Sequence, residues 1–441
     1  MEGSGPIAGF SRLSKTEKIE MAARFSSDPE SFTRQLAGFW HHDPEVQRIL
    51  EEFSENTVSN YYLPFGLAPN FQINDRVYIL PMVIEESSVV AAASKSAKFW
   101  FGRGGFQAEV INTTKPGHVY FKWKVDRDLL LDQEEELEQY LIEHTAYLTE
   151  NMRKRGGGIK SVRILDVAPE MPGYFKIEAL FETADSMGAN FINTCLEAFA
   201  RLLPEYFHDQ GILIDEHDLE INMAILSNNT PECLVRCRVE CSQEEFAGMG
   251  GGLTASEFVG RFREAVHIAN HDPDRAVTHN KGIFNGVDAL ILATGNDYRA
   301  IEAAGHAYAS REGKYSSLST IELSGGKFSY SLRLPMALGT VGGLTQAHPL
   351  ARLSMDLLGF PGARDLMEIA ASAGLANNFG AIWSLVTSGI QKGHMKMHLS
   401  NILNSLGATP DEKDTVGMFF RDKEVTYRAV EDYLIQLRRS R

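Results

Sequence analysis

The 441-residue sequence lacks an excess of basic residues, because 43 lysines and arginines stand against 58 aspartates and glutamates, for a formal net charge of −15. A general nucleic-acid or anionic-membrane binder needs a surplus of cations to neutralise phosphates. The composition therefore argues against a nucleic-acid partner or a membrane partner. It leaves room for a local basic pocket that holds one phosphorylated small molecule.

Long uninterrupted apolar runs are also missing. The N-terminus, MEGSGPIAGFSRLSKTEKIE, has neither an apolar core nor a small-residue cleavage site, so it does not resemble a signal peptide. The most apolar stretch, residues 366–390, is interrupted by Glu368, Asn377 and Asn378. These polar residues favour a buried helix over a membrane span. We therefore expect a soluble protein located in the cytoplasm.

Cysteine is scarce, with four residues, and Cys233, Cys237 and Cys241 recur at every fourth position. Zinc and iron–sulfur sites usually separate two cysteines by two residues, and they need a fourth ligand. On a strand, positions i, i+4 and i+8 share one face, where cysteine behaves as a small apolar residue. The spacing favours a strand in the core, with a metal site as the weaker alternative.

The common catalytic signatures are absent: we find no P-loop, no G-x-S-x-G and no H-E-x-x-H. FGRGGF and GMGGGL each lack the third glycine of the dinucleotide fingerprint, so a Rossmann domain is not expected. His394 and His398 are four residues apart, as in a helical metal pair, but no third ligand is evident. We therefore predict no metal.

The length predicts two or three domains, and the pattern of the chain changes near residue 112. Residues 112–228 alternate as strand, helix, strand, strand, helix and strand, the split βαβ order of ferredoxin-like domains. We predict an α+β protein in which this small domain is inserted into a large, mainly helical domain, residues 1–111 and 229–388. Residues 389–441 form a charged helical tail. The small-residue helix at 87–101 is expected to be central.

A candidate cofactor site lies in FETADSMGANFIN, where a predicted strand passes through Asp185, Gly188 and Asn190 into a helix. A helix N-terminus preceded by glycine offers unpaired N–H groups and a positive potential, which suit a pyrophosphate. The alternative is that Asp185 only caps the helix and Gly188 only makes a tight turn.

The stretch THNKGIFNGVDALILATGND places Lys281 and Asp297 at the two ends of an apolar helix. A buried charge without a partner costs several kcal/mol, so we expect these two groups to find partners. Other polar residues allow two interpretations each. Glu86 either compensates a helix dipole or acts as an acid, Arg275 is a surface arginine or a carboxylate clamp, and His394 is a surface histidine or a general acid.

Seven segments, in order, together resemble the class II 3-hydroxy-3-methylglutaryl-CoA (HMG-CoA) reductases over about residues 10–400. They are LPFGLAPNFQIN, EESSVVAAAS, DSMGAN, ILSN, DPDRAVTHNKGIFNGVDALILATGND, PMALGTVGG and GIQKGHM. The resemblance implies a large helical substrate domain around a central helix, a small non-Rossmann nicotinamide-binding domain and a mobile C-terminal flap. It also implies a homodimer with active sites shared between subunits, with further assembly possible.

The reaction implied by the resemblance reduces the thioester HMG-CoA to mevalonate and free coenzyme A in two hydride steps, with two NADH or two NADPH; some members run it in reverse. Lys281 matches the lysine that faces the substrate carbonyl, with Asp297 and Glu86 as its acidic partners. His394 matches the flap histidine that protonates the departing thiolate. The resemblance further assigns substrate binding to Ser88, Arg275 and Asn285, and cofactor binding to Asp185, Gly188, Ala189, Asn190 and Asn228.

Two other hypotheses stay open at this point. One is a catalytically silent homologue that binds a CoA thioester or a nucleotide, although Glu86, Lys281, Asp297 and His394 are all present. The other is a reductase of a different acyl-CoA. The family's usual DAMGAN is DSMGAN here, so Ser186 is a departure next to the cofactor residues. The sequence does not separate NADH from NADPH, or reduction from its reverse.

Overall fold

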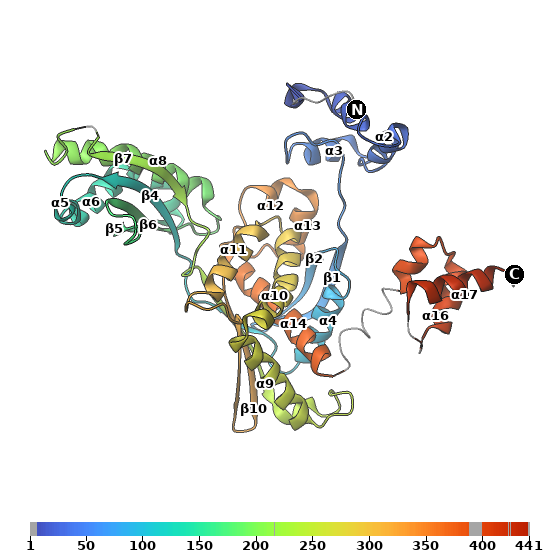
Figure 1. Cartoon of the computed structure of the whole chain (residues 1–441). Helices are drawn as coiled ribbons and strands as arrows, with labels where there is room; N and C mark the ends of the chain where they lie inside the picture. The colour runs from blue at the N-terminus through green and yellow to red at the C-terminus, as the bar shows by residue number, and fades with distance from the viewer. Residues whose placement is uncertain (1–6, 216, 388–398, 422, 424, 440–441) are drawn as a thin grey trace.

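The computed structural model describes residues 7–215, 217–387, 399–421, 423 and 425–439. Figure 1 shows a central body, a small sheet domain on one side of it, and separate groups of helices near the two termini. Helices and antiparallel sheets occur in segregated groups, so the predicted α+β class is confirmed.

The N-terminal helices begin at side chains that accept hydrogen bonds from the first-turn N–H groups. The caps are Ser14, Asp28 and Asp43, and two of these helices have proline at their first position, where no N–H is needed. The helices are α1 (Lys15–Ala23), α2 (Pro29–Gly38) and α3 (Pro44–Glu51).

Helix α14 (Ala363–Val386) is the centre of the large body. It is long and apolar enough to cross a membrane, but 78% of its most apolar window is buried inside the protein. The prediction of a buried helix is therefore confirmed. Small residues let its neighbours approach: a Cβ on Gly380 would lie 2.8 Å from the Ser96 Oγ, and a Cβ on Gly286 would lie 2.4 Å from the Ala373 carbonyl oxygen.

The prediction that the helix at 87–101 is central was wrong in one respect. This helix, α4 (Val89–Trp100), packs against α14 but leaves Ala91, Lys95 and Lys98 exposed. Its alanines and serines do allow the close approach that we expected. Among the described helices the central place belongs to α14, because most of its residues from Leu366 to Trp383 are small or apolar and buried.

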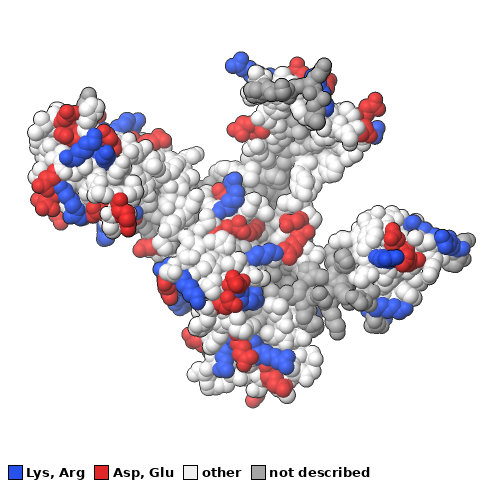
Figure 2. Space-filling model, in the orientation of Figure 1, with Lys and Arg blue, Asp and Glu red and all other residues white. Residues whose placement is uncertain are grey.

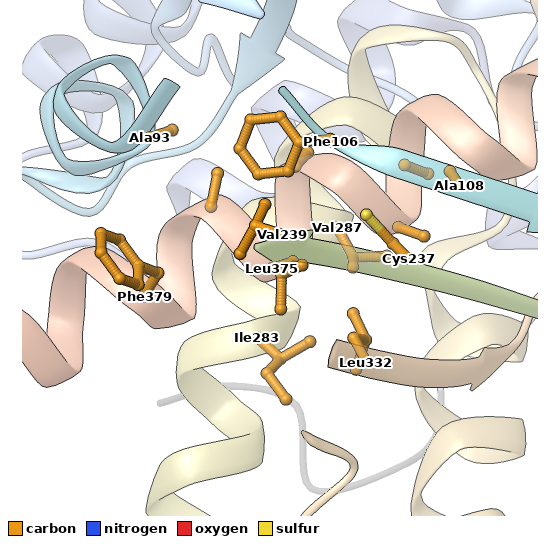
Figure 3. Packing of buried hydrophobic residues seen from close by; sticks show 14 of the residues in the cluster. Ala93, Phe106, Ala108, Cys237, Val239, Ile283, Val287, Leu332, Leu375 and Phe379 are labelled. Atoms are coloured by element: carbon orange, nitrogen blue, oxygen red, sulfur yellow. The ribbon is translucent and has the colours of Figure 1, made fainter. Parts of the chain in front are cut away.

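A four-stranded antiparallel sheet covers one side of α14, with strand order β3-β8-β10-β9. Figure 3 shows Cys237 and Val239 of this sheet meeting Ile283, Val287 and Leu375 in one apolar cluster. Cys233 and Cys241 are buried as well, so the predicted strand of core-facing cysteines is confirmed. The strands are β3 (Gln107–Val110), β8 (Leu234–Ser242), β9 (Ser319–Ser324) and β10 (Lys327–Pro335).

The remaining elements of the large body surround α14 and α4. The hairpin β1–β2 packs on α4, and a capping box of Thr254 and Glu257 starts α9. Their bounds are β1 (Phe65–Ile73), β2 (Arg76–Val83), α9 (Ala255–His271), α10 (Pro273–Ala293), α11 (Tyr298–Ala309), α12 (Leu344–Ala347) and α13 (Pro349–Leu357).

The small sheet domain has the strand order β5-β6-β4-β7, all antiparallel, and a separate apolar core. Glycine is needed at position 117 in β4 because the strand packs closely on α8: a Cβ there would lie 2.5 Å from Leu196. The elements are β4 (Lys115–Trp123), α5 (Arg127–Leu131), α6 (Glu134–His144), α7 (Ala146–Lys154), β5 (Gly158–Asp166), β6 (Tyr174–Glu182), α8 (Ala189–Asp209) and β7 (Leu219–Leu226).

Where one helix is predicted between the first two strands of the small domain, the structure has α6 and α7, preceded by the short α5. The break falls at Thr145, which ends α6 with φ −105° and ψ 8°. Its buried hydroxyl donates to the Leu141 carbonyl oxygen at 2.6 Å, and this carbonyl also accepts from the Thr145 N–H at 3.2 Å.

The C-terminal helices form a third apolar cluster of their own. They comprise a helical stretch at 399–405, α16 (Pro410–Phe419) and α17 (Tyr427–Arg439). Arg438 joins α17 to α16 through an ion pair with Glu412, 2.8 Å from Nε to Oε1. The predicted flap histidine, His394, lies outside the described residues.

The close approach of α10 to α14 gives a first prediction. We expect Gly286→Ala to destabilise the large body by about 1–3 kcal/mol, because its Cβ would collide with the α14 backbone. Gly260→Ala in α9 is the matched control, since it meets nothing within 4 Å and gains helix propensity. Denaturant unfolding measures both. Equal stability of the two variants would contradict the packing described here.

Candidate functional site

Helix α10 carries a polar face on an otherwise buried helix. Asp272 caps its start by accepting from the Asp274 N–H at 3.0 Å, and Pro273 occupies its first position. Lys281, Asn285 and Asp288 follow at spacings of four and three residues, so their side chains lie along one side of the helix. The opposite side packs on α14.

Lys281 pairs with Glu86, which lies in the bend between β2 and α4. The Lys281 Nζ donates to the Glu86 Oε2. The lysine side chain is 57% exposed and the glutamate 36% exposed. The expectation that Lys281 is an interior cation was therefore wrong for the single chain, because the apolar residues around it point to the other side of α10.

Asp297 does not meet Lys281 in this structure. Its Oδ1 accepts from the backbone N–H groups of Arg299 and Ala300, which caps α11, and the Arg299 Nε is 3.0 Å from the same oxygen. From Lys281 to Ala293 alone, the helix rises by about 18 Å. Of the two acidic partners that the resemblance implies for Lys281, the single chain therefore supplies Glu86 and not Asp297.

The three predicted substrate residues differ in where they lie relative to the Lys281–Glu86 pair. Ser88, two residues after Glu86, is exposed and has a φ of 75°, a left-handed conformation that is uncommon for serine. Asn285 lies one turn beyond Lys281. Arg275 is six residues before Lys281, about 1.7 turns, so it projects from a different side of α10.

Arg275 is half-buried, and this burial lowers its pKa, while the nearby Tyr330 hydroxyl raises it. Burial also lowers the pKa of His279 to about 3, helped by the positive charge of Arg275, so this histidine is neutral at pH 7. The His279 Nε2 bonds to the Ser319 Oγ at 2.7 Å, and the Tyr330 hydroxyl donates to the same oxygen at 2.9 Å. This network fixes the start of α10 against β9 and β10.

An acid pair that the sequence analysis did not identify lies on the same side of α10. Asp288 hydrogen-bonds to Glu302 of α11, and its Oδ1 is buried with no hydrogen-bond partner among the described residues. Burial, and secondly the charge of Glu302, raises the pKa of Asp288 to about 8. The only signal in the sequence is the i, i+4, i+7 spacing with Lys281 and Asn285.

The turn between β6 and α8 holds the predicted cofactor residues. Gly188, with φ 89°, packs so closely that a Cβ would lie 2.4 Å from the Thr183 Cγ2. Helix α8 has no side-chain cap, so the N–H groups of its first turn stay open to a ligand. The alternative that Asp185 caps this helix was wrong: its Oδ1 accepts from the Ala363 N–H at the start of α14, at 2.8 Å.

Two cavities lie where this turn meets the large body. A cleft of about 600 Å³ has Asp185 on one wall and Thr340, Gln346 and Arg352 on the other. A small cavity of about 20 Å³ is lined by residues that include Lys115, Ala189, Asn228 and Ala300. The structure thus brings Asp185, Gly188, Ala189 and Asn228 to one junction. The exposed Asn190 follows in the first turn of α8.

Away from this junction, positive charge gathers in a cavity of about 350 Å³ whose lining includes Arg236, Arg238, Arg311 and Arg333. Figure 2 shows basic and acidic side chains intermixed over the face drawn, without a continuous basic surface. Within the described residues, no group of three or more histidine, cysteine, aspartate or glutamate side chains is arranged to hold a metal ion.

Comparisons with known proteins agree with this layout. The family model described as hydroxymethylglutaryl-coenzyme A reductase matches residues 18–399. The chain is 33% identical to the 3-hydroxy-3-methylglutaryl-coenzyme A reductase of Archaeoglobus fulgidus, over 99% of this chain and 95% of that protein. It is 31% identical to a probable 3-hydroxy-3-methylglutaryl-coenzyme A reductase of Borreliella burgdorferi, over 95% of this chain and 92% of that protein.

Solved structures are similar as well. A Streptococcus pneumoniae 3-hydroxy-3-methylglutaryl-coenzyme A reductase superposes with a TM-score of 0.72 at 33% identity, covering 98% of this chain and 99% of that one. The class II reductase from the same organism, bound to NADPH in open conformations, superposes with a TM-score of 0.71 at 34% identity. That match covers 86% of this chain and 99% of the other.

The acid pair generates a prediction about stability and pH. The pKa of Asp288 is raised from an ordinary 3.8 to about 8 on folding, so the folded state holds a proton that the unfolded state releases. The free energy of unfolding should therefore fall as pH rises between these two values. We expect Asp288→Asn, which imitates the protonated acid, to flatten this fall in denaturant unfolding. An unchanged slope would contradict a protonated Asp288.

Proposed function

Because the chain belongs to the HMG-CoA reductase family, in its class II branch, we propose that it reduces HMG-CoA to mevalonate and free coenzyme A with two NADH or two NADPH. The observation that carries this proposal is the Lys281–Glu86 pair beside the left-handed Ser88. A lysine ammonium held by an acidic partner can stabilise the negative oxygen that forms when a hydride adds to a carbonyl carbon.

The residues act as follows in this proposal. The first hydride adds to the thioester carbon, and the oxygen that becomes negative is stabilised by the Lys281 ammonium. Glu86 holds that ammonium in place and belongs to the same proton network. Loss of the CoA thiolate from the thiohemiacetal leaves an aldehyde, and the thiolate takes a proton. A second hydride and a second proton then give the alcohol.

His394 is assigned the proton for the thiolate, on the strength of the family resemblance. Ser88, Arg275 and Asn285 are assigned to the hydroxymethylglutaryl part. Arg275 fits a carboxylate clamp because it is half-buried and has no ion-pair partner in the described part of the chain. The open N–H groups of α8 and the cleft beside Asp185 suit the anionic dinucleotide.

We propose that the enzyme is a homodimer in which Asp297 of one subunit meets Lys281 of the other. The length of α10 supports this, because it keeps the two residues of one chain apart. The single chain also exposes large apolar side chains on elements next to Lys281, as an interface would require: Leu67, Val77, Ile79 and Val277. Further assembly of dimers stays compatible with this arrangement.

The domain assignment follows the same reasoning. Residues 1–111 and 229–388 form the substrate domain, the ferredoxin-like residues 112–228 bind the nicotinamide cofactor, and residues 389–441 form the flap. The separate apolar cores of the small sheet and of the C-terminal helices support this division. We place the protein in the cytoplasm, where its soluble substrates and cofactors are found.

The activity test mixes the purified protein with HMG-CoA and each reduced nicotinamide, and follows the loss of nicotinamide absorbance. We expect Lys281→Ala to reduce turnover about 100-fold or more, with cofactor binding retained, because the developing alkoxide loses its cation. Lys327→Ala is the matched control: Lys327 is 58% exposed and paired with Glu240. Wild-type turnover by Lys281→Ala would show that the lysine assignment is wrong.

Mixed dimers test the shared site. Lys281→Ala and Asp297→Ala should each be inactive alone, but a hybrid dimer would contain one site with both residues intact. Statistical mixing of the two inactive variants then restores about a quarter of wild-type activity. If both residues of a site came from one chain, every site in the hybrid would carry a lesion and no activity would return.

A further inference from the structure

The sheet β3-β8-β10-β9 carries a cavity on its outer face that the proposed reaction does not use. Its volume is about 350 Å³, and small-molecule sites span about 300–1,000 Å³. We call it the arginine cavity, because four of its five charged lining residues are arginines. These charged residues are Arg236, Arg238, Arg311, Arg333 and Glu322.

The alternation of the strands explains why the arginines gather on this face. Buried and more exposed residues alternate along β8 and β10, and Cys237 of β8 points into the apolar cluster (Figure 3). Arg236 and Arg238 of β8 and Arg333 of β10 therefore point away from the core. Arg311, two residues after the end of α11, approaches the cavity from a different element.

Two of these arginines lie directly opposite each other in the sheet. Arg333 pairs in register with Arg236, and the next outward position of β10, Ser331, pairs with Arg238. Like charges at directly opposed positions of antiparallel strands destabilise the pair. A phosphate between the two guanidinium groups would offset this repulsion, because each guanidinium can donate two N–H groups to phosphate oxygens.

Two arginines of the cavity have acidic partners that solvent screens. Arg236 is 2.5 Å from a glutamate oxygen of Glu109, and Arg311 is 3.2 Å from one of Glu312, but these glutamates are 56% and 79% exposed. Exposed pairs of this kind contribute little, so they leave most of the positive potential in place. The Arg311 Nη1 also donates to the Tyr308 carbonyl oxygen at 2.8 Å, which fixes its position.

The other two arginines are less well paired. Arg238 is 3.6 Å from the Glu240 Oε1, and the other oxygen of this carboxylate is only 2.7 Å from Lys327. Arg333 forms no ion pair with any residue that the structure describes. Guanidinium N–H groups of both side chains are therefore available to a ligand.

Hydrogen bonds of the protein itself hold the floor of the cavity. Ser317 lines it and is 6% exposed. Its Oγ donates to the Ser319 carbonyl oxygen at 3.0 Å and accepts from the Ser319 N–H at 3.0 Å. The hydroxyls of Thr320 and Ser331 also line the cavity and bond to each other at 2.9 Å, which uses one of their two hydrogens. A floor fixed in this way lowers the entropy cost of binding.

We propose that the arginine cavity binds a small phosphorylated anion, with a phosphate group held between Arg236 and Arg333. Free diphosphate and the diphosphate of a nucleotide present the same oxygens, so both share the required chemistry. An extended nucleic acid does not fit, because the nearby Glu109 and Glu240 would repel its other phosphates. The cavity contains none of the residues proposed to bind HMG-CoA or the dinucleotide.

Direct binding tests the site. Titration calorimetry on the full chain, with no HMG-CoA or dinucleotide added, measures the affinities of inorganic diphosphate, ADP and citrate. We expect diphosphate to bind at about 1 mM or tighter, and the double variant Arg236→Gln, Arg333→Gln to weaken it about 10-fold or more. Arg163→Gln is the matched control, since Arg163 is an exposed arginine on a strand of the small sheet.

Glu322 supplies a test of opposite sign. Its carboxylate lines the same cavity and repels a bound phosphate, so Glu322→Gln should tighten diphosphate binding about twofold or more. This variant keeps all four arginines, and it decides the matter if the double variant folds poorly. Diphosphate affinity that is unchanged or lower in Glu322→Gln would overturn the proposal.

The remaining outcomes also have defined meanings. Tighter binding of ADP than of diphosphate, lost in the double variant, would support the site and assign the phosphate to a nucleotide; the reverse order would support a free anion. No diphosphate binding by the wild type, equal binding by the double variant, or tighter binding of citrate would overturn the proposal. Absence of HMG-CoA turnover would overturn the proposed function and leave this site untouched.

Discussion

The length and rigidity of helix α10 control the arrangement of the candidate site. Gly286 lets this helix lie against the backbone of α14 with no room for a Cβ, and the His279 network fixes its first turns to the sheet. A helix held in this way presents Lys281 to Glu86 at one point. The helix rises by about 18 Å between Lys281 and its last residue, Ala293, before the chain reaches Asp297. The site therefore needs a second copy of the chain if both residues are to act on one substrate.

The predicted cofactor residues in the turn between β6 and α8 depend on a different packing constraint. The small sheet is joined to the large body by two crossings of the chain, and Lys115 lies at the start of the first one. Asp185 reaches from the turn before α8 to the N-terminus of α14, so the turn is tied to α14, the central helix of the large body. At this junction the small sheet and the large body are thus connected through hydrogen bonds, and each keeps its own apolar core.

Much of the fold could be predicted from the sequence because the local signals agree with the tertiary structure. The alternation in β4 to β7, the cysteine strand β8 and the capping box of α9 all describe elements that the structure contains. Two errors have a common cause. The break at Thr145 and the central place of α14 depend on which neighbours an element meets, and periodicity does not report neighbours.

The candidate site was less predictable for the same reason. Apolar neighbours in the sequence suggested that Lys281 is buried, yet a helix turns its polar and apolar residues to opposite sides, and the lysine is exposed in the single chain. Asp288 and Lys115 were missed because neither stands in a recognisable motif. Only the folded chain reveals that Asp288 meets Glu302 and that Lys115 lies under the turn before α8.

The most direct test of the central claim is a crystal structure of the protein with bound HMG-CoA. We expect the Lys281 Nζ within hydrogen-bond distance of the acyl carbonyl oxygen, about 2.7–3.2 Å, with an Asp297 carboxylate from the second subunit beside it. A lysine that stays in solvent, far from the acyl group, or an Asp297 that approaches from its own chain, would contradict the account.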